Sequence, residues 1–252
     1  MGVAIVTGAQ RGMGKAIALA LAAEGYDIAA VDLEINAALE EVVFMCAAMK
    51  VKAVGLYCDI GNLSTHEAML EAAEAALGPL TTLVNNAGVS VKSRGDLLEV
   101  TPEAYDHCLN INTRGTFFLT QAFAKRMRDT PTTCHRSIIT ITSTNATAVS
   151  IARGEYCISK AGASMMSKLF AARLSDEDIG VYEIQPGVID TDMVKPSRAK
   201  YEALIESGLT VIKRLGTPEE VARIVVTLAN GLLPYTSGQA IQADGGLSTV
   251  RF

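Results

Sequence analysis

The sequence predicts an α/β fold: a doubly wound parallel sheet of about seven strands with helices on both of its faces. Short apolar segments alternate with helix-forming segments along the 252-residue chain. The apolar segments lack the polar alternation of a half-exposed strand, which indicates that both of their faces are buried. Parallel strands joined by right-handed helical crossovers account for both observations.

The predicted strands and helices follow one another along the chain. Strands are expected at residues 3–7, 27–32, 51–59, 80–88, 136–143, 179–187 and 238–246. Helices are expected at residues 14–25, 35–50, 64–78, 101–129, 154–176 and 217–231. Gly25 is a plausible stop for the first helix, and Ser64 with Glu67 three positions later is a plausible capping pair for the third.

The chain is predicted to form one domain over residues 1–252, because no Pro-, Ser- or Gly-rich linker interrupts this alternation. The longest irregular stretch covers residues 188–215, between the sixth strand and the last helix. A loop of that length in a compact domain is usually a lid or a binding element. We therefore expect residues 188–215 to form a substrate-binding loop.

The composition argues against several classes of protein. Hydrophobic residues make up 49% of the chain and charged residues only 19%, which predicts a large core and surface buried in an oligomer. The net charge of −5 argues against a nucleic-acid partner. The apolar run at residues 16–23 is too short to span a bilayer, and no signal peptide precedes the first strand. A cytoplasmic protein without membrane association is expected.

The cysteines and histidines predict neither a metal site nor a disulfide framework. The five cysteines are scattered and contain no C-x-x-C pair, and the three histidines lack the H-E-x-x-H spacing. Free thiols in a reducing compartment are the simplest account.

A glycine-rich turn, T-G-A-Q-R-G-M-G at residues 7–14, follows the first predicted strand directly. Gly8, Gly12 and Gly14 allow tight turning and a close approach of the backbone to a pyrophosphate at a helix N-terminus. Glycines also serve tight packing in many folds, but the position between a strand and a helix favours dinucleotide binding. A Rossmann-type fold follows.

The acidic residue at the end of the second strand indicates which dinucleotide is preferred. Asp32 lies 24 residues after Gly8, a distance at which a carboxylate hydrogen-bonds the adenosine ribose and repels a 2′-phosphate. Arg11 lies in the glycine turn and favours NADP instead. The carboxylate imposes the more direct penalty, so NAD is the predicted cofactor and NADP the alternative.

Tyr156 and Lys160 lie four positions apart on a predicted helix, so their side chains are neighbours. An ammonium beside a phenol favours the phenolate and is expected to lower the pKa of Tyr156. The pair then provides an acid/base group without histidine. A lone pair with this spacing is more often an ordinary solvent-facing pair, and the remaining motifs decide between the two interpretations.

Five motifs together resemble those of the short-chain dehydrogenase/reductase family. They are T-G-x-x-x-G-x-G at 7–14, N-N-A-G at 85–88, a serine at 143, Y-x-x-x-K at 156–160 and P-G at 186–187. The resemblance covers essentially the whole chain in the family's order and spacing. The segments P-G-V-I-D-T-D-M and R-L-G-T-P-E-E-V-A further resemble the 3-oxoacyl-(acyl-carrier-protein) reductase-like members.

This resemblance implies roles for four catalytic residues. Tyr156 would exchange a proton with the substrate oxygen, while Lys160 would lower the pKa of Tyr156 and bind the nicotinamide ribose. Ser143 would hydrogen-bond the substrate oxygen. Asn112 matches the family's helix asparagine, which is thought to hold a water that relays protons to Lys160; Asn110 lacks the matching glycine. Taken singly, Ser143 could merely end a strand and Asn112 could be satisfied by a neighbouring carbonyl.

The resemblance also implies a cofactor-binding set that runs along the strand ends. Its members are Gly8, Gln10, Arg11, Gly12, Met13, Gly14, Asp32, Leu33, Asp59, Ile60, Asn86, Ala87, Gly88, Tyr156, Lys160, Pro186, Gly187, Ile189 and Thr191. Asp59 would bind the adenine amino group, although it could instead cap the next turn. No metal is implied.

The chain departs from the family pattern in two places. The sixth strand carries Tyr182, Glu183 and Gln185 where many relatives have asparagine and small residues. The connection at residues 129–137 is less basic than usual, which weakens an acyl-carrier-protein docking surface; Arg128, Arg136 and Arg173 are generic candidates for one.

The predicted activity is hydride transfer between NAD(H) and a secondary alcohol/carbonyl pair in a sugar, polyol or other small hydroxy compound. The first alternative is reduction of a 3-oxoacyl thioester, with acyl carrier protein as a partner only in that case. The second alternative is a nonenzymatic NAD-binding regulator. The resemblance further implies a homotetramer or homodimer that packs its long helices against a partner.

Overall fold

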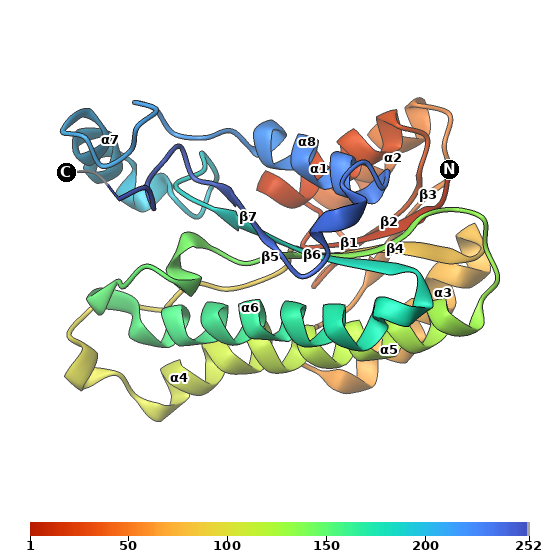
Figure 1. The fold of residues 1–252 in the computed structure, drawn as a ribbon, viewed down its shortest axis with the longest axis horizontal. Helices are drawn as coiled ribbons and strands as arrows, with labels where there is room; N and C mark the ends of the chain where they lie inside the picture. The colour runs from red at the N-terminus through yellow and green to blue at the C-terminus, as the bar shows by residue number, and fades with distance from the viewer. Residues whose placement is uncertain (251–252) are drawn as a thin grey trace.

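The computed structural model describes residues 1–250 and contains one sheet of seven parallel strands in the order β3-β2-β1-β4-β5-β6-β7 (Figure 1). The strands are β1 (Val3–Thr7), β2 (Asp27–Asp32), β3 (Ala53–Tyr57), β4 (Leu80–Asn85), β5 (Arg136–Ile141), β6 (Ile179–Pro186) and β7 (Ala240–Ala243). The predicted doubly wound sheet is therefore confirmed.

Helices cover both faces of this sheet, with α1, α2 and α8 on one face and α3 to α6 on the other (Figure 1). Their bounds are α1 (Gly12–Ala23), α2 (Ala37–Ala48), α3 (His66–Leu77), α4 (Pro102–Leu109), α5 (Thr116–Asp129), α6 (Gly154–Leu174), α7 (Arg198–Glu206) and α8 (Pro218–Ala229). The α1 helix packs closely on α8, and α6 lies against β6.

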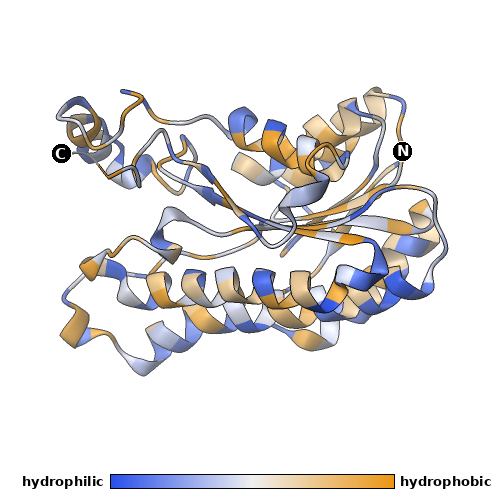
Figure 2. Ribbon diagram, in the orientation of Figure 1, coloured by the Kyte–Doolittle hydropathy of each residue, from blue (hydrophilic) through white to orange (hydrophobic). Residues whose placement is uncertain are grey.

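The core consists of two hydrophobic layers separated by the sheet (Figure 2). Successive strand residues point to opposite faces, so Ile139 belongs to the layer under α1 and α8 while its neighbour Ile138 belongs to the layer under α5 and α6. In β6 the same alternation places Tyr182 in the first layer and Val181 in the second. Burial on both faces explains why the strands lack polar alternation.

The strand order reverses at β1, which pairs with β2 on one side and with β4 on the other. The chain first builds β2 and β3 outward from β1, then crosses over to build β4 to β7 in the opposite direction. In open parallel sheets such a reversal leaves a crevice beyond the carboxyl ends of the strands. The fold therefore positions a binding site at the ends of β1 and β4.

The single helix predicted over residues 101–129 is interrupted by a π-helical turn at Asn110–Gly115, and this prediction was wrong in that respect. Thr116 Oγ1 hydrogen-bonds the carbonyl of Ile111, five residues earlier. A Cβ added to Gly115 would lie 2.0 Å from the carbonyl oxygen of Ile60, so the turn packs directly on the loop after β3. Such π turns occur frequently at functional sites.

Two further predictions need correction. The α3 helix begins at His66, and Ser64 lies in the preceding short turn, where Asn62 Oδ1 accepts its N–H at 3.3 Å. Ser64 is therefore capped by Asn62 and does not cap the helix. The stretch at residues 188–215 is not wholly irregular, since it contains α7, whose own residue Ile205 is buried.

Candidate active site

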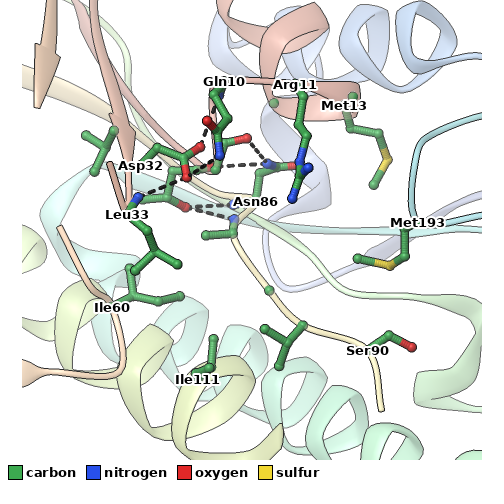
Figure 3. Close-up of a pocket in the computed structure, with 18 of the residues that line it drawn as sticks. Gln10, Arg11, Met13, Asp32, Leu33, Ile60, Asn86, Ser90, Ile111 and Met193 are labelled. Carbon is green, nitrogen blue, oxygen red and sulfur yellow. Dashed lines mark hydrogen bonds between the residues drawn. The ribbon is translucent and has the colours of Figure 1, made fainter. Parts of the chain in front are cut away.

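A cleft of about 590 Å³ lies beyond the carboxyl ends of β1, β2 and β4. Its volume falls within the range of small-molecule sites. Fourteen predicted cofactor-binding residues line it: Gly8, Gln10, Arg11, Gly12, Met13, Gly14, Asp32, Leu33, Asp59, Ile60, Asn86, Ala87, Gly88 and Thr191. In Figure 3, Asp32 and Leu33 lie at one end of the cleft, and Met193 and Ser90 lie at the other.

The glycine turn forms one wall of the cleft, and its backbone conformation requires glycine. Gly8 and Gly12 have φ values of +66° and +54°, a left-handed conformation that costs other residues energy. A Cβ at Gly14 would lie 2.0 Å from the carbonyl oxygen of Gly8. The side chain of Asn86 donates to the carbonyls of Thr7 and Gly8 at 2.8 and 3.2 Å, which fixes the turn to the end of β4.

The carboxylate of Asp32 is held by donors on three sides. The backbone N–H and the side-chain amide of Gln10 both donate to it at 3.1 Å, and the N–H of Leu33 donates at 2.9 Å (Figure 3). Asn36 in turn donates to Gln10 Oε1 at 3.0 Å. These contacts hold a negative charge at the end of β2 that faces the cleft.

Five of the predicted cofactor residues do not line this cleft: Tyr156, Lys160, Pro186, Gly187 and Ile189. Pro186 is the last residue of β6 and Ile189 is buried beside Gly216, while Gly187 packs against the backbone of Asp244. Asp59 does line the cleft, and its Oδ1 also accepts the N–H of Gly61 at 2.9 Å, so the capping alternative holds as well.

Several residues that line the cleft were missed by sequence reasoning. They are Thr7, Val31, Cys58, Val89, Ser90, Val91, His107, Ile111, Asp192 and Met193. Val89 to Val91 follow the N-N-A-G motif directly, so their place in the sequence could have indicated that they line the cleft. His107 comes from α4 and carried no signal in the sequence.

Asn112, on the π turn, ties this wall to α6. Its Oδ1 accepts the N–H of Val89 at 2.8 Å, and its Nδ2 donates to the carbonyl of Val89 and to Ser159 Oγ, both at 2.9 Å. A Cβ added to Gly88 would lie 3.0 Å from Asn112 Oδ1 and 3.4 Å from Lys160 Nζ. Asn112 and Lys160 therefore converge behind Gly88, at the wall of the cleft.

Tyr156 and Lys160 both lie buried in the first half of α6, so the pair is not a solvent-facing one. Lys160 Nζ donates to the carbonyl of Ile141 at 3.1 Å and lies 5.9 Å from the centroid of the Tyr156 ring. Ser143 follows β5, where its hydroxyl accepts the N–H of Asn145 at 3.1 Å and thus caps the turn that follows.

The pKa expected for Tyr156 was wrong in direction. Burial raises the pKa of Tyr156 above its ordinary value, and interactions with the Ser143 hydroxyl and the Arg153 charge oppose this rise only in part. Burial also lowers the pKa of Lys160 to about 8. The sequence indicated that Tyr156 and Lys160 are neighbours. It did not indicate that both are buried, which makes their charged forms less favourable.

Arg153 is a residue at this site that sequence reasoning missed. Its guanidinium lies 5.2 Å from the centroid of the Tyr156 ring and donates to Asn145 Oδ1 at 2.6 Å. It also donates to Ser150 Oγ at 3.3 Å. These contacts hold a cation against the phenol, where cation–π attraction and charge favour the phenolate.

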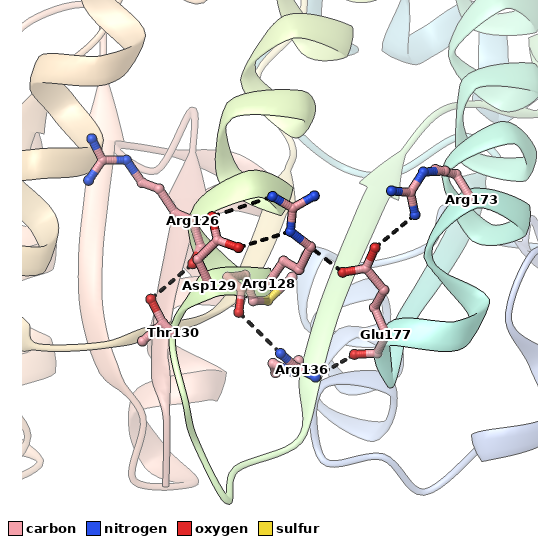
Figure 4. Close-up of polar contacts among 8 residues, drawn as sticks. Arg126, Arg128, Asp129, Thr130, Arg136, Arg173 and Glu177 are labelled. Carbon is pink, nitrogen blue, oxygen red and sulfur yellow. Dashed lines mark hydrogen bonds and ion pairs between the residues drawn. The ribbon is translucent and has the colours of Figure 1, made fainter.

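The three arginines considered for carrier-protein docking meet around Glu177, in the turn after α6 (Figure 4), whereas Tyr156 lies in the first turn of that helix. Arg173 pairs with Glu177 at 2.7 Å, Arg128 pairs with Asp129 at 2.9 Å, and Arg136 donates to the carbonyl of Glu177. Two carboxylates thus neutralise much of this charge.

Neither a bilayer-spanning helix nor a cluster of metal ligands occurs within residues 1–250. None of the helices there combines the length and apolar character needed to cross a bilayer. Within the same residues, no three His, Cys, Asp or Glu side chains come together as a set of metal ligands. All five cysteines are free thiols.

One family model and several known proteins are similar to this chain over almost its whole length. The model described as enoyl-(acyl carrier protein) reductase matches residues 8–248. Acetoacetyl-CoA reductase of Shinella zoogloeoides is 35% identical and aligns over 97% of both proteins. D-threitol dehydrogenase of Mycolicibacterium smegmatis is 32% identical, over 97% of this chain and 92% of that protein.

A solved structure extends the similarity to three dimensions. The 3-oxoacyl-[acyl-carrier protein] reductase of Brucella melitensis in complex with NAD has a TM-score of 0.96 and 42% sequence identity. The match covers 100% of this chain and 98% of that one.

We predict that Asn112→Ala destabilises the protein more than Asn110→Ala. The first change leaves the part-buried N–H and carbonyl of Val89 and the buried hydroxyl of Ser159 without their partner, at about 1–3 kcal/mol for each group left unpaired away from water. The second removes a 3.2 Å hydrogen bond to the carbonyl of Gly61 and an exposed 3.2 Å one from Arg114, at about 1 kcal/mol for each or less, because water can replace the lost partners. Urea unfolding of both variants checks this, and equal losses would contradict it.

Proposed function

This chain belongs to the short-chain dehydrogenase/reductase family, and from that premise we propose that it transfers a hydride between NAD(H) and a secondary alcohol/carbonyl substrate. Oxidoreductases of this family act on CH–OH groups. The observation that carries the proposal is the convergence of Asn112 and Lys160 behind Gly88, at the wall of a cleft that carries the Asp32 carboxylate.

The residues that line the cleft fit a dinucleotide. The backbone of Gly8, Gly12 and Gly14 would hold the pyrophosphate at the start of α1, where no Cβ obstructs its approach. The Asp32 carboxylate, held by Gln10, would accept hydrogen bonds from the adenosine ribose. When bound, the nicotinamide accepts or supplies the hydride.

The side chains around Tyr156 would move the proton. In the reductive direction, the Tyr156 hydroxyl gives its proton to the carbonyl oxygen while Ser143 Oγ hydrogen-bonds the same oxygen. The cations of Arg153 and Lys160 stabilise the phenolate that forms. Asn112 holds the wall segment at Val89 in position. In the oxidative direction, Tyr156 takes the proton back.

We favour a sugar, polyol or other small hydroxy compound as the substrate, bound beneath residues 188–215. The Asp32 carboxylate suits NAD, which supports oxidation. The similarity to a D-threitol dehydrogenase supports the same class. A cytoplasmic location is part of the proposal, and the five free thiols support it.

A 3-oxoacyl thioester is the second candidate substrate. Two similar proteins are named acetoacetyl-CoA reductase and 3-oxoacyl-[acyl-carrier protein] reductase, and the latter was solved with NAD. A preference for NAD therefore does not oppose this candidate. The neutralised arginines around Glu177 favour a coenzyme A thioester over docking of acyl carrier protein. We do not propose the nonenzymatic regulator, because the family is one of oxidoreductases.

We predict that Tyr156→Phe lowers kcat by about a hundredfold to ten-thousandfold, because it removes the proton donor. The dissociation constant for NADH should change little, because the ring remains in place. Absorbance at 340 nm with polyols, sugars, secondary alcohols and hydroxyacyl thioesters measures the first quantity, and NADH fluorescence measures the second. Tyr182→Phe, on the opposite face of the sheet, is the control. Normal turnover by Tyr156→Phe would rule out this mechanism.

We predict that Asp32→Ala narrows the preference for NADH over NADPH by tenfold or more, or about 1.4 kcal/mol. The change removes the carboxylate that repels a 2′-phosphate. Dissociation constants for both cofactors measure the effect, with Arg11→Ala as the comparison. If Asp32→Ala leaves both constants unchanged while Arg11→Ala weakens NADPH alone, then Arg11 governs the choice.

We further propose that the protein is a homodimer or homotetramer that packs α5 and α6 against a second copy. Exposed apolar side chains run along one face of α6 at Ile158, Met165 and Leu169, and Phe118 on α5 is exposed as well. Exposed apolar patches of this kind are typical of interaction surfaces.

Light scattering after size exclusion should therefore give two or four times the 26.6 kDa mass. Met165→Lys with Leu169→Lys should shift the protein to the monomer, because two charges would then be buried at the interface. Phe44→Lys, at an exposed apolar residue on α2, is the control and should leave the mass unchanged. A wild-type mass equal to the monomer would refute the proposal.

A further inference from the structure

Glu183 is a buried acidic side chain that the proposed reaction does not use. It lies on β6 with 1% of its surface exposed, facing α6. Its Oε1 accepts from Thr142 Oγ1 at 2.6 Å and from Gln185 Nε2 at 2.9 Å, and its Oε2 accepts from Ser164 Oγ at 2.8 Å. All three donors are neutral, so hydrogen bonds satisfy the carboxylate but do not balance its charge.

Two short connections link this carboxylate to Lys160, although the two side chains form no direct ion pair and Lys160 Nζ bonds the carbonyl of Ile141. Ser164, which donates to Glu183, lies one helical turn after Lys160 on the same face of α6. Thr142, which also donates to Glu183, follows Ile141, whose carbonyl accepts from Lys160 Nζ. Lys160 is itself buried, with 7% of its surface exposed.

The other ionisable groups around Lys160 do not balance its charge. Tyr156, on the same helix, is a phenol whose pKa burial raises. Cys108, on α4, is a buried thiol whose pKa burial also raises, so it too is neutral at ordinary pH. Glu155, on α6, is a second buried carboxylate, but its charge raises the pKa of Cys108 and not that of Lys160, and Arg153 has the same sign of charge as Lys160. Glu183 is the carboxylate whose charge raises the pKa of Lys160.

We propose that Glu183 is a buried counter-ion that keeps Lys160 protonated in the active site. Burial alone would favour the neutral amine of Lys160. The charge of the Glu183 carboxylate, on β6, favours the protonated form instead. Glu183 is thus a positioning residue, since it does not line the cleft and its hydrogen-bond partners are Thr142, Ser164 and Gln185. Its benefit to catalysis rests on the proposed function, but its effect on Lys160 exists in the protein alone.

The test measures the protonation of Lys160 without substrate or cofactor. NMR titration of protein with labelled lysine side chains gives the pH midpoint of each lysine, and Lys160→Met identifies the signal of Lys160. Glu183→Gln keeps the shape and removes the charge: the amide oxygen still accepts from Thr142, and the amide NH2 donates to Ser164 Oγ, reversing that hydrogen bond. The midpoint of Lys160 should fall by about 1 pH unit or more. The high-pH limb of kcat should move in the same direction.

Ser164→Ala is the matched control, because it removes one hydrogen bond from the same carboxylate and leaves the charge. It should leave the midpoint of Lys160 close to that of the wild type. An unchanged midpoint in Glu183→Gln, or an equal shift in Ser164→Ala, would overturn the proposal. The NMR measurement does not depend on turnover. A lack of activity with every substrate would therefore count against the proposed function and not against this role of Glu183.

A second experiment applies if Glu183→Gln is poorly folded. Lys160→Met leaves the Glu183 carboxylate buried without its counter-ion, so this variant should unfold at lower urea. Adding Glu183→Gln to Lys160→Met should restore part of the lost stability, because the unbalanced charge is gone. A double variant less stable than Lys160→Met would contradict the proposal.

Discussion

The cleft depends on one crowded junction, where the ends of β1 and β4 meet the first turn of α1. Buried carbonyls there must find partners, and the side chain of Asn86 provides them for Thr7 and Gly8. The contact is possible only because Gly14 has no Cβ to obstruct the carbonyl of Gly8. The strand order opens a crevice at this point, and these contacts keep the backbone that lines it in one conformation.

Two proton-transfer groups near the cleft, Tyr156 and Lys160, each have a side chain of opposite charge type nearby. Arg153 lies over the ring of Tyr156, and the Glu183 carboxylate accepts from Ser164, one helical turn after Lys160. A buried charge is costly unless another group compensates it. In this arrangement each proton-transfer group has its own partner: Arg153 precedes Tyr156 at the start of α6, and Glu183 comes from β6.

Much of the fold and site could be predicted because strand ends fix the positions of the residues that follow them. Asp32 and the glycine turn are examples. Tyr156 was located by its spacing from Lys160, but the direction of its pKa shift was not, because burial is a property of the whole fold. Arg153 was missed because its contact depends on how the segment before α6 folds back. The turn at Asn110–Gly115 was missed because none of its residues breaks a helix.

That π turn adds a sensitivity to chain length to the side-chain requirements at Asn112 and Gly115. Each residue of a helix advances its direction by about 100°. Deleting one residue between Asn110 and Gly115 would restore a continuous helix but rotate α4 by that angle relative to α5. His107 would then leave the cleft and Cys108 its buried position. Insertions and deletions here should therefore be far rarer among functional variants than changes of side chain.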